Sequence, residues 1–143
     1  MKYFVVSLVI CSLVMSYSEA QELPMRLKKI VEECKARLGA GDDDVAAMFK
    51  YEPATNKQVK CLHACTMRLL GILDKNNKPF EAGAMAYIKS VTASNAELEK
   101  LLTEVYNECK YFPASKEGCE FSEAFRVCII ERSRAKGIHM LLH

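Results

Sequence analysis

The sequence predicts a single all-α domain, a compact bundle of about six helices, and three observations support that prediction. After the first 20 residues, apolar side chains recur every three or four positions along nearly the whole chain, as they do on one face of a helix. No segment alternates polar and apolar residues for long enough to predict a strand. Six cysteines lie after residue 20, and they can form disulfides that link the helices of such a bundle.

Residues 1–20 are expected to be a secretory signal peptide. Lys2 gives a positive start, residues 3–15 form a nearly unbroken apolar run, and Ser18 and Ala20 place small residues where a signal peptidase cleaves. The run is too short for a membrane span with ordinary flanks. Cleavage after Ala20 leaves residues 21–143, a chain of 143 − 20 = 123 residues, which is the size of one domain.

The first half of this domain predicts three helices. Apolar residues repeat with helical spacing over 23–38, and Gly39 then ends the first helix. The acidic residues 42–44 favour the start of a short second helix, which Pro53 ends. Asn56 is a suitable cap for a third helix that is expected to run to about residue 74.

The second half predicts three more helices. After a polar turn over 75–79, a fourth helix is expected from Phe80 to about residue 91. Ser94 and Glu97 form a capping-box pattern, so the fifth helix is expected to start at Ser94 and to run through Cys109. Pro113 breaks the chain, and the sixth helix is expected to begin near residues 116–119.

The cysteines indicate three disulfides. Cys11 lies in the leader, and an even number of cysteines in the remaining secreted chain is typical of disulfides rather than of a metal site. Spacing alone leaves several pairings open. Cys61 and Cys65 lie one helical turn apart and point the same way, so they are poorly placed to bond each other and well placed to join one helix to two partners.

The full cysteine spacing resembles that of a known protein family. The pattern Cys34-x26-Cys61-x3-Cys65-x43-Cys109-x9-Cys119-x8-Cys128, behind a secretory leader, is similar to that of the insect odorant-binding proteins, the pheromone and general odorant-binding protein family. The resemblance covers essentially the whole mature chain. It implies three interlocked bridges, Cys34–Cys65, Cys61–Cys119 and Cys109–Cys128.

The resemblance also implies a function. Members of that family are carriers without catalytic activity or cofactor, and they hold a small volatile lipophilic ligand in a central apolar cavity. They move it through aqueous sensillar lymph towards olfactory receptors at a membrane. A non-olfactory lipophilic-ligand carrier or a signalling or venom protein on the same scaffold is the alternative. Whether the chain is a monomer or a weak homodimer stays open.

The residues expected to line the cavity are mostly apolar or aromatic. Core packing uses the same residue types, so for the methionines and phenylalanines the two roles overlap. The expected lining is Met48, Phe49, His63, Met67, Leu70, Leu73, Met85, Tyr87, Ile88, Leu102, Tyr106, Phe121, Phe125, Ile129, Ile138 and Leu141.

The polar contact for a ligand head group is expected to come from a histidine or a tyrosine. His63, Met67 and Leu70 share one face of the third predicted helix. By its position relative to Cys65, Met67 resembles a family site where some members place a hydroxyl, and methionine cannot donate a proton. His63, Tyr87 or Tyr106 would then replace that contact. The alternative for His63 is a half-buried helix histidine with satisfied hydrogen bonds.

The C-terminal segment 138–142 is apolar although it lies near the end of the chain. We expect it to fold back and close one side of the cavity, and a loose or membrane-contacting tail is the alternative. His139 and His143 flank this segment, so their protonation is a hypothesis for pH-dependent ligand release, to which His63 could also contribute.

Several other functions are excluded by the sequence. The net charge of +2 without a long basic run gives no surface for nucleic acid. The segment Cys61-Leu62-His63-Ala64-Cys65 superficially resembles that of secreted phospholipases A2, but the paired cysteines and the glycine-rich calcium loop are missing. A zinc site at these residues is not expected, because a secreted chain oxidises its thiols. We therefore expect no enzyme and no metal.

Overall fold

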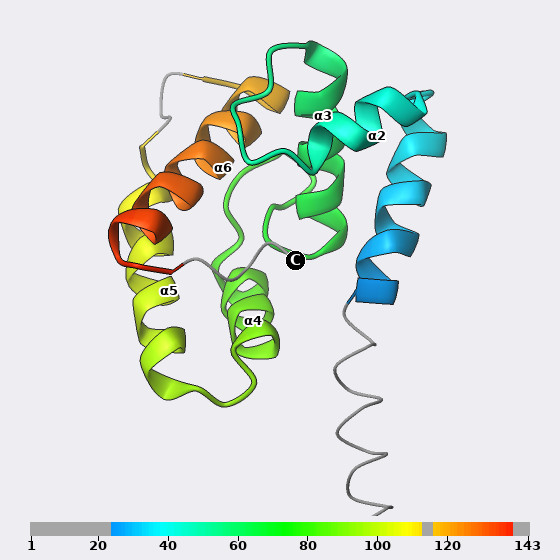
Figure 1. Cartoon of the computed structure of the whole chain (residues 1–143). Coiled ribbons are helices and arrows are strands. Elements are labelled where there is room, and N and C mark those ends of the chain that lie inside the picture. Colours follow the sequence, from blue (N-terminus) through cyan, green and yellow to red (C-terminus); the bar gives the residue numbers. More distant parts are fainter. Residues whose placement is uncertain (1–23, 113–115, 139–143) are drawn as a thin grey trace, which may run out of the picture.

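The computed structural model describes residues 24–112 and 116–138, and within these ranges every regular element is a helix (Figure 1). The all-α prediction is therefore confirmed. The predicted signal peptide and the C-terminal residues 139–143 lie outside the described residues. The helices are residues 24–38, α2 (Asp42–Met48), α3 (Lys57–Leu69), α4 (Glu81–Thr92), α5 (Ala96–Cys109) and α6 (Gly118–Ala135).

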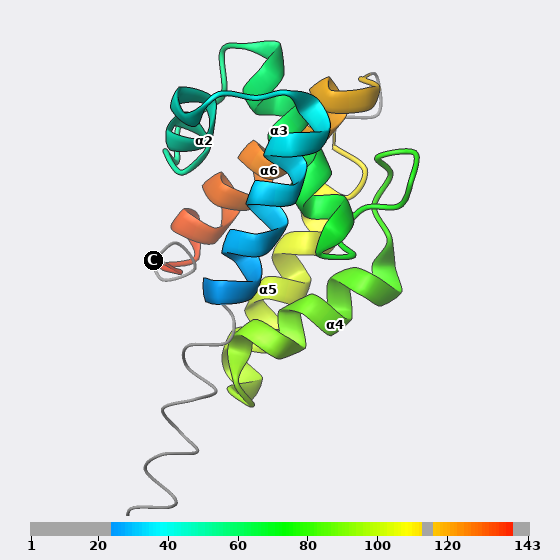
Figure 2. The same ribbon diagram turned by 90° about the vertical axis from the view of Figure 1, so that its right-hand side faces the viewer.

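The helices pack around a centre rather than in a flat layer (Figure 2). α3 contacts α2 and α6, and α5 contacts α6 and α4. The helix 24–38 runs beside α3 and crosses in front of α5 in Figure 2. Two hydrophobic clusters result, a larger one between α4, α5 and α6 around Phe125 and a smaller one between the helix 24–38 and α3 around Leu62.

α3 begins where the sequence predicts and ends early. The side chain of Asn56 accepts a hydrogen bond from the backbone N–H of Val59 at 2.8 Å and so caps the first turn. The predicted continuation to residue 74 is wrong. Gly71 turns the chain with a φ of 80°, and Leu73 then forms an isolated bridge with Pro79.

The predicted capping box at Ser94 is also wrong, by one residue. Ala93 and Ser94 both have positive φ, 46° and 69°, because the chain reverses direction there between α4 and α5. Asn95 follows in an extended conformation, and its side chain accepts a hydrogen bond from the N–H of Leu98 at 3.0 Å. The reversal therefore transfers the cap of α5 from Ser94 to Asn95.

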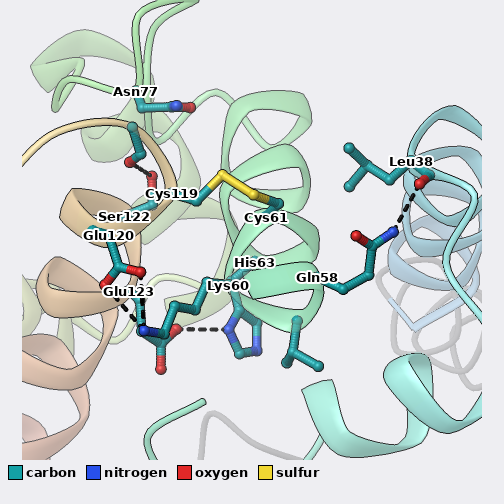
Figure 3. The surroundings of a disulfide bond; sticks show 12 residues. Leu38, Gln58, Lys60, Cys61, His63, Asn77, Cys119, Glu120, Ser122 and Glu123 are labelled. Carbon is teal, nitrogen blue, oxygen red and sulfur yellow. Dashed lines mark hydrogen bonds and ion pairs between the residues drawn. A yellow bond between two sulfur atoms is a disulfide. The ribbon is translucent and has the colours of Figure 1, made fainter. Parts of the chain in front are cut away.

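Three disulfides connect four of the helices, and α3 and α6 each take part in two of them. Figure 3 shows one of them, Cys61–Cys119, which joins α3 to α6. The cysteines of α3 bond to two different partners, as their spacing of one turn predicts. The bonds are Cys34–Cys65, Cys61–Cys119 and Cys109–Cys128, the pairing that the resemblance implies.

Candidate ligand-binding cavity

A cavity of about 270 Å³ lies between the helices. Every helix of the described chain contributes to its wall, and the wall is mostly apolar. Both hydrophobic clusters border it, so the cavity is a gap between two parts of the core. Apolar cavities of this kind are typical of sites for small lipophilic molecules, which gain free energy from the removal of their surface from water.

Most of the residues predicted from helical spacing border this cavity. Helical spacing places one face of α3 towards the cavity, and one face each of α4, α5 and α6 also borders it. The predicted residues on the wall are Met48, Phe49, His63, Met67, Leu70, Tyr87, Ile88, Leu102, Tyr106, Phe125 and Ile129.

Four predicted residues are placed elsewhere. Leu73, Phe121 and Ile138 are buried in the larger cluster, and Met85 packs against it half-buried. Leu73 follows the end of α3 into the turn, which takes it away from the inner face of that helix. Phe121 stacks on Phe125 at 6.3 Å between ring centroids, so it supports the wall from behind. The predicted lining residue Leu141 lies outside the described residues.

The prediction missed other wall residues. The apolar ones lie on the helical stripes of their segments and could have been found by extending those stripes. Tyr51 and Arg126 are different, because a loop tyrosine and an arginine give no apolar signal. The missed residues are Leu27, Tyr51, Ile72, Ala84, Val91, Val105, Arg126 and Ile130.

His63 is buried on the wall and hydrogen-bonded on both sides of its ring. Its Nδ1 lies 2.8 Å from Oε2 of Glu123 on α6, a contact that Figure 3 shows between α3 and α6. Its Nε2 lies 3.0 Å from the carbonyl oxygen of Met48 at the end of α2. The imidazole therefore connects three helices. These contacts agree with the alternative prediction for His63, a helix histidine with satisfied hydrogen bonds.

Glu123 is the centre of this group, although the sequence did not single it out. Its carboxylate accepts hydrogen bonds from Nε and Nη2 of Arg126 at 2.9 and 2.7 Å and from the backbone N–H of Ala54 at 2.7 Å. Burial alone would raise the pKa of Glu123. The hydrogen bonds from Arg126, His63 and Ala54, together with the charge of Arg126, outweigh burial and lower the pKa from 4.5 to about 2.

Only acceptors face the ring of His63, since an ionised carboxylate and a backbone carbonyl cannot donate a hydrogen bond. Both ring nitrogens are therefore occupied by protein groups, which leaves neither of them free to contact a ligand.

Similarity to known proteins identifies the family of this chain. The family model described as the PBP/GOBP family matches residues 17–132. The chain belongs to this family. It is 30% identical over 115 residues to general odorant-binding protein 19d of Drosophila melanogaster, covering 80% of this chain and 77% of that protein. It is also 30% identical over 127 residues to general odorant-binding protein 28a of the same species, covering 89% and 88%.

A solved structure of a family member has the same fold. The chain resembles odorant-binding protein 28a from Drosophila melanogaster with a TM-score of 0.71 and 30% identity, over 82% of this chain and 98% of that one. Odorant-binding proteins are binding carriers rather than enzymes, so membership of the PBP/GOBP family makes this chain a carrier of small ligands and not an enzyme.

Within this odorant-binding fold the cavity offers a second kind of polar group. Burial raises the pKa of Tyr87 and of Tyr106, so both keep their hydroxyl protons at neutral pH. Among the described residues, neither hydroxyl has a hydrogen-bond partner. Burial also raises the pKa of Tyr51, opposed by the charge of Arg126. The tyrosines can therefore donate hydrogen bonds into the cavity.

The described residues contain neither a cluster of metal ligands nor a helix that could span a membrane. Within residues 24–112 and 116–138, no three or more His, Cys, Asp and Glu side chains gather in a way that could hold a metal ion. No helix in those ranges is long and apolar enough to span a membrane.

Proposed function

We propose that this protein is a secreted carrier of odorants or pheromones, which takes a small lipophilic molecule into the cavity and carries it through aqueous lymph to olfactory receptors. The observation that supports the proposal is the apolar cavity of about 270 Å³ in a member of an odorant-binding family. The apolar run at residues 1–20 supports secretion with removal of a signal peptide. A signalling protein on the same scaffold would bind its receptor through its surface and would need no such cavity.

The energetics suit reversible carriage. A cavity of about 270 Å³ accommodates roughly nine groups of the size of a water molecule, at about 30 Å³ each. The eight carbons of an octyl chain gain about 6 kcal/mol by burial, at about 0.8 kcal/mol each. The loss of translational and conformational freedom offsets part of this gain. The result is binding that can be released at a receptor.

The test is calorimetric titration of the protein with 1-octanol. Ala84 borders the cavity and is buried, so Ala84→Leu fills part of the space and is expected to weaken octanol binding about tenfold. Ala86 lies on the same helix and is exposed, so Ala86→Leu is the matched control and should leave the affinity unchanged. Failure of the unmodified protein to bind octanol or any other ligand with an eight-carbon chain would refute a lipophilic cavity site.

Native mass spectrometry of protein from its source tissue tests the biological part of the proposal. The expected spectrum contains a bound lipophilic molecule on a chain that begins at residue 21. The same spectrum gives the oligomeric state, for which monomer and weak homodimer are both compatible with the cavity.

A further inference from the structure

The cavity wall carries one permanent charge, and that charge is positive. Among the residues that border the cavity, Arg126 is always cationic, and no aspartate or glutamate is present. Glu123 contacts both Arg126 and His63 but does not itself border the cavity. The polar corner of the cavity therefore presents the guanidinium of Arg126, with its carboxylate partner outside the wall.

Arg126 has one carboxylate as its partner, and this carboxylate lies outside the wall. Glu123 is ionised and accepts from Nε and Nη2 of Arg126. The side chains of Glu123 and Arg126 are 6% and 13% exposed, so water reaches this pair only in part. The positive member of the pair borders the cavity and the negative member does not.

Arg126 also has unused hydrogen-bond donors. Its Nε donates to Glu123, and its Nη2 donates to Glu123 and to the carbonyl of Glu52 at 2.8 Å. Nη1 carries two further N–H groups, and no residue of the described chain accepts from them. The fork of Nε and Nη2 is occupied by Glu123, and Nη1 can still donate a charge-assisted hydrogen bond to an anionic oxygen.

We propose that the cavity takes a medium-chain fatty acid in its carboxylate form, with the head group at Arg126 and the chain among the apolar residues of the opposite wall. This ligand class rests on the proposed carrier function and narrows it. The carboxylate accepts from Nη1 and lies beside the positive charge of the guanidinium. The hydrocarbon chain then lies toward the helix 24–38, α4 and α5, whose wall residues include Leu27, Ile88, Val91 and Leu102.

The first experiment is calorimetric titration at pH 7 with octanoate, methyl octanoate and 1-octanol, which share the length of chain that the cavity fits. Octanoate is expected to bind at least tenfold tighter than the two neutral compounds. Tight binding of octanol with equal or weaker binding of octanoate would overturn the carboxylate proposal and leave the carrier function standing. If none of the three binds, both proposals fail.

The second experiment uses variants whose effects on charge have opposite signs. Arg126→Gln removes the proposed head-group donor, so the ratio of octanoate to octanol affinity should fall about tenfold. Glu123→Gln removes the competing carboxylate, so the same ratio should rise several-fold. Any loosening of the fold weakens both ligands and cancels in the ratio. Arg132 lies on the same helix, is 56% exposed and does not border the cavity, so Arg132→Gln should leave the ratio unchanged.

A third measurement requires no substitution. Octanoate labelled with ¹³C at its carboxyl carbon reports its own ionisation when it is bound. Next to Arg126 and His63, and with Glu123 and the Tyr51 hydroxyl as the other titratable groups in the corner, the bound acid should titrate at a lower pH than free octanoic acid. A bound carboxyl group that titrates at a higher pH lies in an apolar site, and this result would contradict the proposal even if the variants failed to fold.

Discussion

The two sides of the cavity are held in different ways. On the side of α3 and α6, Cys61–Cys119 joins the two helices covalently, and the hydrogen bonds of Glu123 fix His63, Arg126 and the backbone at Ala54. α4, on the other side, contains no cysteine and packs on α5 through apolar residues such as Ala84 and Ile88. A carrier needs both properties, since a fixed polar corner would orient a ligand and a wall held mainly by packing can open for its entry.

The largest expected effect comes from removal of the covalent joint between α3 and α6. Replacement of both Cys61 and Cys119 by alanine should lower the free energy of unfolding by about 4 kcal/mol, because the bond closes a sequence separation of 58 residues. The Cys109–Cys128 bond closes only 19 residues, and its removal should cost about 3 kcal/mol. Urea unfolding followed by circular dichroism measures both. The reverse order would contradict an entropic origin of the bracing.

Removal of the carboxylate at the centre of the polar corner should have the next largest effect. Glu123→Ala leaves Arg126 without its counter-charge and Nδ1 of His63 without its partner, so the free energy of unfolding should fall by about 3 kcal/mol. Glu120 lies three residues earlier on α6, and its pair with Lys60 is half exposed. Glu120→Ala is therefore the control and should cost under about 1 kcal/mol. Equal losses in the two variants would mean that the buried network does not hold this wall.

The same carboxylate gives a pH dependence of known sign. Its pKa is about 2 in the folded protein against an ordinary value of 4.5, so the ionised form stabilises the fold. This contribution is present above about pH 4.5 and is lost as the pH falls towards 2, with a total of up to about 3 kcal/mol. Thermal unfolding of the unmodified protein and of Glu123→Gln between pH 7 and pH 2 should converge at the acid end. A constant difference down to pH 2 would assign the stabilisation to another group.

This pH range bears on ligand release. Between pH 7 and pH 5 Glu123 stays ionised, so acidification over that range leaves its hydrogen bonds with Arg126 in place. The hypothesis that His63 contributes to release stays a prediction. The contribution of His139 and His143 stays a prediction, since both lie outside the described residues.

Hydrogen exchange should separate the two walls without any substitution. We expect the backbone amides in the last two turns of α4 to exchange about tenfold faster than those at the centre of α3, because apolar packing is their main tertiary restraint. The first turn of α4 is a partial exception, since Gly83 lies so close to Gly71 that a Cβ there would be 1.9 Å from the Gly71 carbonyl oxygen. Equal protection of both helices would remove the distinction between a fixed and a movable wall.

The apolar side of this arrangement could be predicted from sequence, and the polar side only in part. His63, Met67 and Leu70 follow at four and three residues, so helical geometry alone places them on one face, and all three border the cavity. Glu123 and Ala54 are 69 residues apart, and no periodicity reveals that their loop and helix meet. Arg126 was missed for the same reason, because its hydrogen bond to the carbonyl of Glu52 joins residues 74 positions apart.

Local chemistry limited the prediction in a second way. Asn56 and Asn95 both cap helices, but only the first could be chosen from the sequence, because Ser94 offered a competing pattern one residue earlier. The left-handed conformations of Ala93 and Ser94 place the cap at Asn95, and these conformations depend on how α4 and α5 pack. Phe121 and Leu73 show the same limit, since an apolar stripe does not distinguish a cavity wall from the core behind it.

The smallest expected effect tests whether a surface charge pair helps to hold the α4 wall. Lys110 at the end of α5 lies 3.1 Å from Glu81 in the first turn of α4, and the glutamate is 68% exposed. Lys110→Met keeps the aliphatic stem over Tyr106 and removes the charge, so it should lower the free energy of unfolding by only about 0.5 kcal/mol. Comparison of its urea midpoint at low and at high salt measures the Coulomb part, which should vanish at high salt. A loss as large as that of Glu123→Ala would show that α4 depends on charge as much as α6 does, and the contrast between the two walls would then be lost.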